Sequence, residues 1–151
     1  MIDFNRLTDY TKEIIYSAQQ TMYRYKNSQL EPIHIMLAIA EDNEGIAIDY
    51  CKELKIDNDN FKHQLVNEIS NLPQIQNSNP NQQLYLSQMT NNMLDIAQEN
   101  ANSLKDSFIS IEHILMAMTE LNNSKIQQIL NNNKKSYKYY KTFIALELCY
   151  C

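Results

Sequence analysis

The sequence predicts an all-α fold in which two tandem copies of a roughly four-helix unit pack about a pseudo-two-fold axis. Three observations support this prediction: an internal repeat, apolar residues at helical spacing, and a single glycine, Gly45, among 151 residues. Tight two-residue β-hairpins favour glycine, so its scarcity argues against an all-β fold. The length suits one compact domain, and the hydrophobic content of 44% supplies a core.

The repeat becomes visible when the chain is shifted on itself by 79 residues, which aligns residues 11–51 with residues 90–130 without a gap. Identical residues then fall on one another in both halves: Ala18/Ala97, Lys26/Lys105, Ser28/Ser107, His34/His113, Ala38/Ala117 and Glu41/Glu120. One copy could not bury its apolar stripes alone. We therefore expect the copies to pack face to face, with the groove between them as the binding surface.

The first copy, about residues 4–71, is expected to form four helices. Its first helix has Asp3 as the N-cap and an apolar stripe of period 3.6: Leu7, Ile14, Ala18, Met22 and Tyr25. The second helix begins near Glu31-Pro32, because proline suits a first turn, and ends near residues 43–45. A third helix covers residues 46–54. The fourth follows residues 57–59 and carries Phe61, Leu65, Val66 and Ile69.

A linker at residues 72–83 holds two of the three prolines and shows no helical periodicity. The second copy, about residues 84–133, starts with a helix whose apolar face holds Leu86, Met93, Ala97, Ala101 and Leu104. Ser110 is the expected N-cap of its next helix, and a last helix runs near residues 125–130. Residues 1–133 thus form the double domain, and residues 134–151 form a tail or an extra helix.

Composition excludes several function classes. The net charge of -5 gives no attraction to phosphate backbones, and the short basic stretch Lys134–Lys141 is expected to face solvent, so no nucleic-acid partner is expected. A phosphate-binding loop needs several glycines. No window approaches the roughly 20 apolar residues of a membrane span, and the N-terminus lacks the apolar run of a signal peptide. The odd cysteine count (Cys51, Cys149 and Cys151) indicates a reducing compartment, either cytoplasm-like or an organelle stroma or matrix.

No catalytic or metal-binding constellation is visible. His34 and His113 each lie near the start of an apolar helix, and a metal site would need three or four converging ligands. We expect both rings to pack at their helix starts and to hydrogen-bond locally. The carboxylates are scattered, with no pair placed for acid–base work. The chain is therefore not expected to be an enzyme or to bind a cofactor.

Two exposed-face features remain as candidate contacts. Tyr16 and Tyr23 are seven residues apart, roughly opposite the first apolar stripe, and could form an apolar patch or stand exposed without a role. Ile96 lies to one side of its helix stripe, where the first copy has Ser17. An apolar side chain in place of a polar one suggests an added contact with the other copy or with a ligand.

Several separated segments resemble one family. Leu30–Asp42 (LEPIHIMLAIAED) has a proline and a histidine opening an apolar helix, and Asp106–Met118 (DSFISIEHILMAM) looks like its second-copy counterpart. The sequence resembles the double Clp N-domain of AAA+ unfoldases. Arg6–Thr8 and Leu72–Ile75 make it resemble the ClpB branch more than ClpA or ClpC.

The resemblance implies a non-catalytic domain that captures unfolded or aggregated polypeptide through an apolar groove between the repeats. It implies substrate-handling roles for Thr8, Asp106 and Glu112, and it places groove positions on Ile96 and His113. For Thr8 and Glu112, helix capping and first-turn stabilisation are equally good interpretations.

ATP and Mg²⁺ would belong to a hexameric parent protein, and the isolated domain would be a monomer. Adaptor or co-chaperone proteins are further expected partners. One alternative function is adaptor docking, as in ClpA and ClpC relatives. Another is a purely structural helical spacer.

Overall fold

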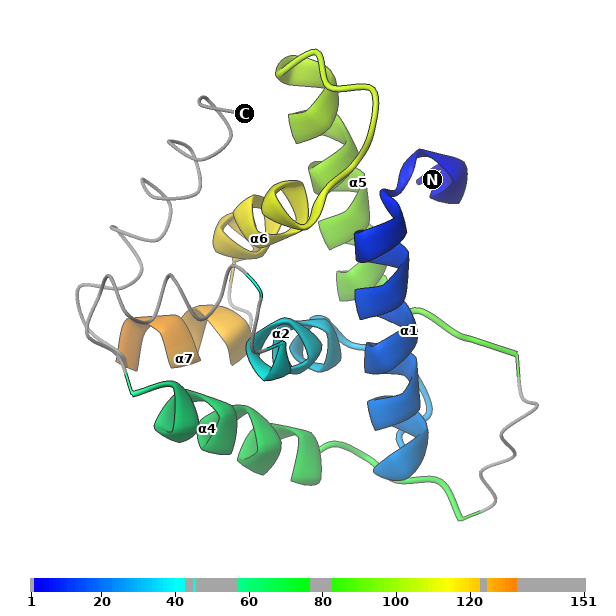
Figure 1. Ribbon diagram of the computed structural model, residues 1–151. Helices are drawn as coiled ribbons and strands as arrows, with labels where there is room; N and C mark the ends of the chain where they lie inside the picture. Colours follow the sequence, from blue (N-terminus) through cyan, green and yellow to red (C-terminus); the bar gives the residue numbers. More distant parts are fainter. Residues whose placement is uncertain (1, 43–44, 46–56, 77–82, 123–124, 133–151) are drawn as a thin grey trace.

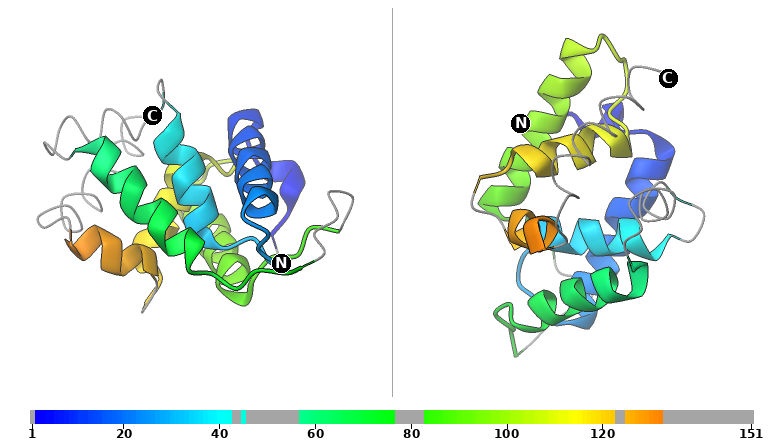
Figure 2. Two further views of the ribbon diagram at one scale, coloured as in Figure 1. Left: turned by 90° about the horizontal axis from the view of Figure 1, so that it is seen from below. Right: turned by 90° about the vertical axis from the view of Figure 1, so that its left-hand side faces the viewer.

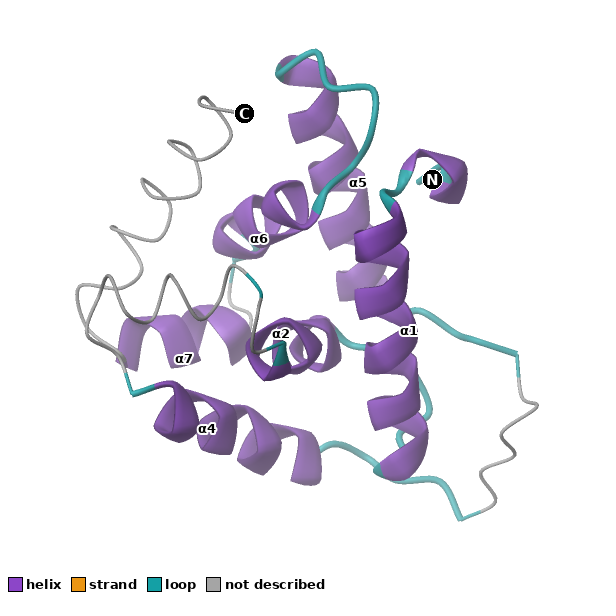
Figure 3. Cartoon of the chain, viewed as in Figure 1, coloured by secondary structure: helices purple, strands orange, loops and turns teal. Residues whose placement is uncertain are grey.

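The computed structural model describes residues 2–42, 45, 57–76, 83–122 and 125–132, and within these ranges it contains helices and loops but no β-strand (Figures 1 and 3). The elements are the 3-10 helix η1 (Phe4–Arg6) and the α-helices α1 (Asp9–Arg24), α2 (Pro32–Glu41), α4 (Asn58–Ser70), α5 (Gln88–Ser103), α6 (Ile111–Glu120) and α7 (Lys125–Asn132). The predicted all-α fold is confirmed.

The internal repeat is visible in the helix boundaries. Helices α1 and α5 each have 16 residues, and α2 and α6 each have 10. Helices α5 and α6 begin 79 residues after α1 and α2, at Gln88 against Asp9 and at Ile111 against Pro32. Helix α7 begins 79 residues after residue 46, but the first copy's predicted helix over residues 46–54 lies outside the described residues.

The loops that follow α1 and α5 have the same backbone conformation. Lys26 and Lys105 adopt left-handed φ angles of 57° and 60°. After α1, the Lys26 N–H donates to Tyr23 O and the Asn27 N–H to Met22 O, both at 3.0 Å, and the loop after α5 repeats this pattern. This is the Schellman arrangement, in which glycine usually takes the left-handed position. Here a lysine takes that position in both copies.

The two copies exchange equivalent short backbone segments. Leu7 forms an isolated parallel bridge with Ile109, and Leu30 forms one with Leu86. Since Leu86 and Ile109 are the repeat-mates of Leu7 and Leu30, each copy binds the other through the same pair of segments. The segment before one copy's first helix pairs with the segment before the other copy's second helix, as in an isologous dimer interface. Two equivalent backbone bridges therefore join the copies.

Helix α2 lies at the centre of the molecule. It contacts α1, α4, α5 and α7, and the left panel of Figure 2 shows α4, α2 and α1 side by side. Its residues from Pro32 to Ala40 are all buried. Ala18, Ala97 and Ala117 are fully buried where helices approach closely, and Ala38 is 5% exposed. These matched alanines belong to the scaffold.

Some predicted details are wrong. Asp3 caps η1 rather than the first long helix, and Thr8 caps α1. Leu7 therefore precedes α1, and its burial comes from pairing with the second copy. Tyr16 is 63% exposed as predicted, but Tyr23 packs against the core and accepts a hydrogen bond from Gln19 Nε2 at 2.9 Å, so they form no shared patch.

The linker is described only at residues 72–76 and 83. There the Ile75 N–H donates to Lys26 O at 2.8 Å, and Asn27 Nδ2 donates to Pro73 O at 3.2 Å. The start of the linker is thereby bound to the loop after α1. The tail and all three cysteines lie outside the described residues.

Candidate functional site

The two matched histidines are structural residues. His34 and His113 are 0% and 2% exposed, and each Nδ1 accepts the backbone N–H of its helix cap, Glu31 or Ser110, at 2.9 Å. The proton of a neutral ring must then sit on Nε2. The prediction of local hydrogen bonding at helix starts is confirmed. Within the described ranges, no group of three or more His, Cys, Asp or Glu side chains is arranged to hold a metal ion.

The Nε2 partners of the histidines differ between the copies. His34 Nε2 donates to Asn27 Oδ1 and His113 Nε2 to Asp106 Oδ2, both at 2.9 Å. Asn27 is buried, whereas the Asp106 side chain is 45% exposed. Burial lowers the pKa of His34 to about 4, so this ring is neutral at physiological pH. His113 is too buried to form the groove wall that the resemblance implied.

Three of the predicted site residues lie at one junction, where the N-terminus of α1 meets the loop before α6. Thr8 Oγ1 accepts the Thr11 N–H at 3.1 Å, and the Thr8 N–H donates to Ile109 O at 3.1 Å. Ile109 stands in the chain between Asp106 and Glu112, which lies half-buried in the first turn of α6. Each of the three thus has a visible structural role: a cap for Thr8, a histidine partner for Asp106, and a favourable helix-dipole position for Glu112.

Ile96, the fourth predicted site residue, lines a separate hollow of about 800 Å³ beside α5 and the C-terminal end of α6. We call it the wide hollow. Nine of its ten lining residues belong to the second copy and Glu31 to the first: Glu31, Ser87, Gln88, Met89, Asn92, Asp95, Ile96, Glu120, Leu121 and Asn122. The junction residues Thr8, Asp106 and Glu112 do not line it.

The apolar surface of the wide hollow comes from Met89, Ile96 and Leu121. Met89 and Ile96 are partly buried side chains packed against the core, and Leu121 is 6% exposed. Glu31, Asp95 and Glu120 supply carboxylates, and no Lys or Arg is among the described residues that line this hollow. The result is an apolar surface surrounded by negative charge.

The first copy has a hollow at the equivalent place, with a volume of about 390 Å³, which we call the polar hollow. Subtracting 79 from positions in the wide hollow gives five of its lining residues: Tyr10, Glu13, Ser17, Glu41 and Asp42. Its other lining residues are Ile14 and Ala38. The three apolar side chains of the wide hollow are thus replaced by tyrosine, serine and aspartate.

Tyr10 and Asp42 give the polar hollow a hydrogen-bonded polar pair where the wide hollow has Met89 and Leu121. The Tyr10 hydroxyl donates to Asp42 Oδ2, and partial burial together with this carboxylate raises the pKa of Tyr10 well above its usual range. A Cβ atom added at Gly45 would lie 2.8 Å from both the Tyr10 hydroxyl and Asp42 Oδ2. A larger residue at position 45 would therefore require the ends of these two side chains to move.

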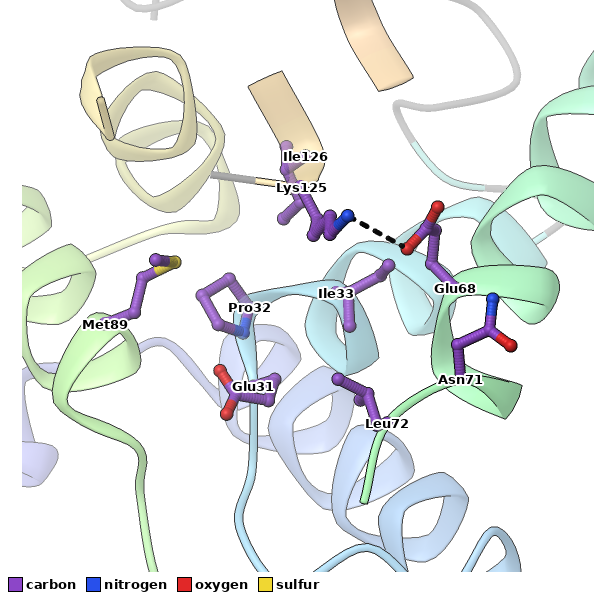
Figure 4. Close-up of a pocket in the computed structure, with 9 residues that line it drawn as sticks. All are labelled: Glu31, Pro32, Ile33, Glu68, Asn71, Leu72, Met89, Lys125 and Ile126. Carbon is purple, nitrogen blue, oxygen red and sulfur yellow. Dashed lines mark ion pairs between the residues drawn. The ribbon is translucent and has the colours of Figure 1, made fainter. Parts of the chain in front are cut away.

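A third cavity, which we call the narrow hollow, has a volume of about 420 Å³ and lies between the N-terminus of α2, the end of α4 and the starts of α5 and α7 (Figure 4). Its nine lining residues are Glu31, Pro32, Ile33, Glu68, Asn71, Leu72, Met89, Lys125 and Ile126. Glu68 and Lys125 form an ion pair across it, with 3.8 Å between Oε2 and Nζ. Glu31 and Met89 line both the narrow and the wide hollow.

The sequence pointed to Ile96 but missed Met89, Leu121 and the narrow hollow. The repeat comparison could have indicated two of these residues, because the 79-residue offset aligns apolar Met89 with Tyr10 and apolar Leu121 with Asp42. The narrow hollow gave no such signal, because four helices from both copies form it.

Among the described helices, none combines the length and apolar character required to cross a bilayer.

Comparisons with known proteins agree on one family. The model of the Clp repeat (R) N-terminal domain matches residues 6–133. The chaperone protein ClpB 1 of Synechocystis sp. is 34% identical over 122 residues, which are 78% of this chain and 13% of that protein. The chain spans only about 13–15% of the length of the curated ClpB relatives that it matches.

Solved structures show the same fold. The Hsp104 N-terminal domain from Candida albicans is similar with a TM-score of 0.80 and 22% identity, covering 91% of this chain and 88% of that one. The N-terminal domain of the caseinolytic protease associated chaperone ClpD from Arabidopsis thaliana gives a TM-score of 0.72 at 15% identity, covering 97% and 99%.

Proposed function

The chain belongs to the Clp repeat N-terminal domain family, and we propose that it is the client-binding N-terminal domain of a ClpB-type protein disaggregase. In this proposal it captures unfolded or aggregated polypeptide in the wide hollow and performs no catalysis. ATP and Mg²⁺ would be bound by other domains of a hexameric parent protein.

The observation that carries the proposal is the contrast between the wide and the polar hollow. They stand at equivalent places in the fold, but only the wide hollow combines Met89, Ile96 and Leu121. Non-native proteins expose apolar side chains, which such a surface would remove from water. Each bulky anchor would contribute about 1.5–3 kcal/mol at most.

Affinity is expected to be weak, because ordering a flexible client opposes much of the gain from burial. Weak binding suits a domain that must release its client to the rest of the machine. Display of six copies on a hexamer would compensate through avidity.

We keep Thr8, Asp106 and Glu112 as a proposed second client contact at the junction between α1 and α6. Two of the three present carboxylates on a partly exposed surface, although all three have structural roles. Glu112→Gln tests this contact, because it removes the charge while keeping the shape of the side chain. A loss of client binding without a change in thermal unfolding would support a direct contact, and unchanged binding would leave Glu112 with only its structural role.

The test of the wide hollow is a titration of the chain with a reduced and alkylated model protein that cannot fold. Ile96→Asp should weaken binding about tenfold or more, because it places a charge on the apolar surface. Ser17→Asp is the matched control, since it makes the same residue at the equivalent place in the polar hollow. Equal binding by wild type and Ile96→Asp would show that the wide hollow does not bind the client.

The salt dependence of the same titration separates this function from adaptor docking. The wide hollow also carries the carboxylates of Glu31, Asp95 and Glu120, which a basic patch on a folded adaptor could contact. Such a contact would weaken steeply as salt screens it, whereas apolar burial would change little. A binding constant dominated by salt would favour the adaptor-docking alternative.

A further inference from the structure

The wide and narrow hollows adjoin. Glu31 and Met89 line both, so the surface continues from Ile96 past Met89 to Leu72 at the end of α4. In Figure 4, Met89 of α5 faces Pro32 of α2 across the narrow hollow. A ligand long enough to extend beyond the wide hollow would therefore meet the narrow one.

The narrow hollow can hold an apolar side chain. Pro32, Ile33 and Ile126 form buried apolar walls, and Leu72 is a partly buried residue at its edge. Its volume of about 420 Å³ exceeds that of a bulky side chain. Glu68 and Lys125 in its wall form an ion pair with each other, so neither demands a charged ligand, and its third charged lining residue is Glu31.

The boundary between the hollows is negative. Glu31 is half-buried there, and its side chain also forms a capping box with the backbone N–H of His34 at the start of α2. Asp95 and Glu120 add two carboxylates on the side of the wide hollow. A ligand crossing this boundary meets negative potential beside an apolar surface, which favours a cation on the ligand.

Glu31 is specific to the first copy. Its repeat-mate, Ser110, caps α6 through the same type of capping box but carries no charge. The charged boundary is therefore not a requirement of the capping geometry, because serine performs that role in the second copy.

From this continuity and charge we propose that the joined hollows bind one polypeptide segment with a bulky apolar side chain in each hollow and a lysine or arginine between them at Glu31. This rests on the proposed function for the wide hollow and adds the narrow hollow as a second subsite. The ligand class is a segment of alternating apolar and basic residues, and a purely apolar segment would bind less tightly.

The test is a double-mutant cycle with two fluorescent peptides, read by anisotropy on the whole chain. One peptide has two leucines flanking a lysine, and the other has methionine in place of the lysine. The spacing of the leucines increases by one residue along a series of such pairs. Glu31→Gln removes the charge but keeps an oxygen that can accept the His34 N–H. Glu41→Gln, in the polar hollow, is the matched control.

For the best-spaced pair, Glu31→Gln should weaken the lysine peptide about three- to fivefold, the size expected for a partly exposed ion pair. It should leave the methionine peptide unchanged, and Glu41→Gln should change neither. Equal effects of Glu31→Gln on both peptides would overturn the pairing of a basic residue with Glu31.

Leu72→Asp tests the second subsite and should weaken both peptides about tenfold. If Leu72→Asp binds like wild type while Ile96→Asp does not bind, the narrow hollow is not a subsite and the proposed function stands. If Ile96→Asp also binds like wild type, the proposed function itself fails. If Leu72→Asp does not fold, the double-mutant cycle at Glu31 still tests whether a basic residue of the ligand pairs with Glu31.

Discussion

The wide hollow and the polar hollow occupy equivalent places in two copies of one unit, yet they offer opposite surfaces. Both carry three carboxylates, from Glu31, Asp95 and Glu120 in one and from Glu13, Glu41 and Asp42 in the other. They differ in size, about 800 against 390 Å³, and in the three positions where Met89, Ile96 and Leu121 are replaced by Tyr10, Ser17 and Asp42. The repeat thus keeps its scaffold while the surfaces over that scaffold differ between the copies.

The histidine sites show the same division between scaffold and specialised residues. The ring positions, caps and Nδ1 bonds are the same, but Asn27 accepts from one ring and Asp106 from the other. The buried site has the neutral partner, and the half-exposed site has the charged one. Burial explains this difference, since an ionised carboxylate is costly to remove from water.

The largest expected effect tests whether the copies are equal in scaffold. Leu30 and Ile109 are repeat-mates, both 0% exposed, in the segments that join the copies. Leu30→Ala and Ile109→Ala should each lower the free energy of unfolding by about 2–5 kcal/mol, because each leaves a cavity. Urea denaturation measures this. A large loss in one variant and almost none in the other would contradict the reciprocal architecture.

The next effect concerns acid stability and distinguishes the histidine sites. Burial lowers the pKa of His34 from 6.5 to about 4. Between pH 6.5 and 4, the ring therefore binds a proton in the unfolded chain but stays neutral in the folded chain. The stabilisation is complete above pH 6.5 and is lost as the pH falls towards 4, by on the order of 2–3 kcal/mol.

Urea titrations across this pH range measure that loss, with His34→Gln as the control that removes the titrating ring. The variant should show a shallower dependence of the unfolding free energy on pH. Identical slopes for wild type and His34→Gln would contradict the assignment of the acid sensitivity to this residue.

The smallest effect is expected to be equal in the two copies. Lys26 and Lys105 hold left-handed φ angles of 57° and 60°, which glycine adopts without steric cost. Lys26→Gly and Lys105→Gly should each raise the free energy of unfolding by up to about 1 kcal/mol. Thermal unfolding of the two variants checks this. If either variant is less stable than wild type, the stabilisation from that lysine side chain exceeds the cost of its left-handed backbone conformation.

The sequence was sufficient for the helices because periodicity, caps and the 79-residue offset are local signals. Ser110 and the helix after Asp57 were predicted from such signals and confirmed. Asp3 was assigned to the wrong helix, because a single 3-10 turn separates it from α1 and pattern alone does not show that turn.

The candidate site was only partly predictable. Ile96 was found because its repeat-mate, Ser17, differs in polarity. The narrow hollow is formed where helices of the two copies pack together, and no local sequence pattern predicts that packing. The roles of Glu31, Leu72 and Ile126 therefore could not be predicted. The bond between Tyr10 and Asp42, 32 residues apart, likewise exists only in the folded chain.

The central claim is that client polypeptide occupies the wide hollow and not its equivalent in the first copy. The most direct measurement places a photo-crosslinking amino acid at position 96 or at position 17 and irradiates each chain with an unfolded model protein. Strong crosslinking from position 96 and little from position 17 is the predicted result. Equal crosslinking from both positions, or crosslinking from position 17 alone, would contradict the account.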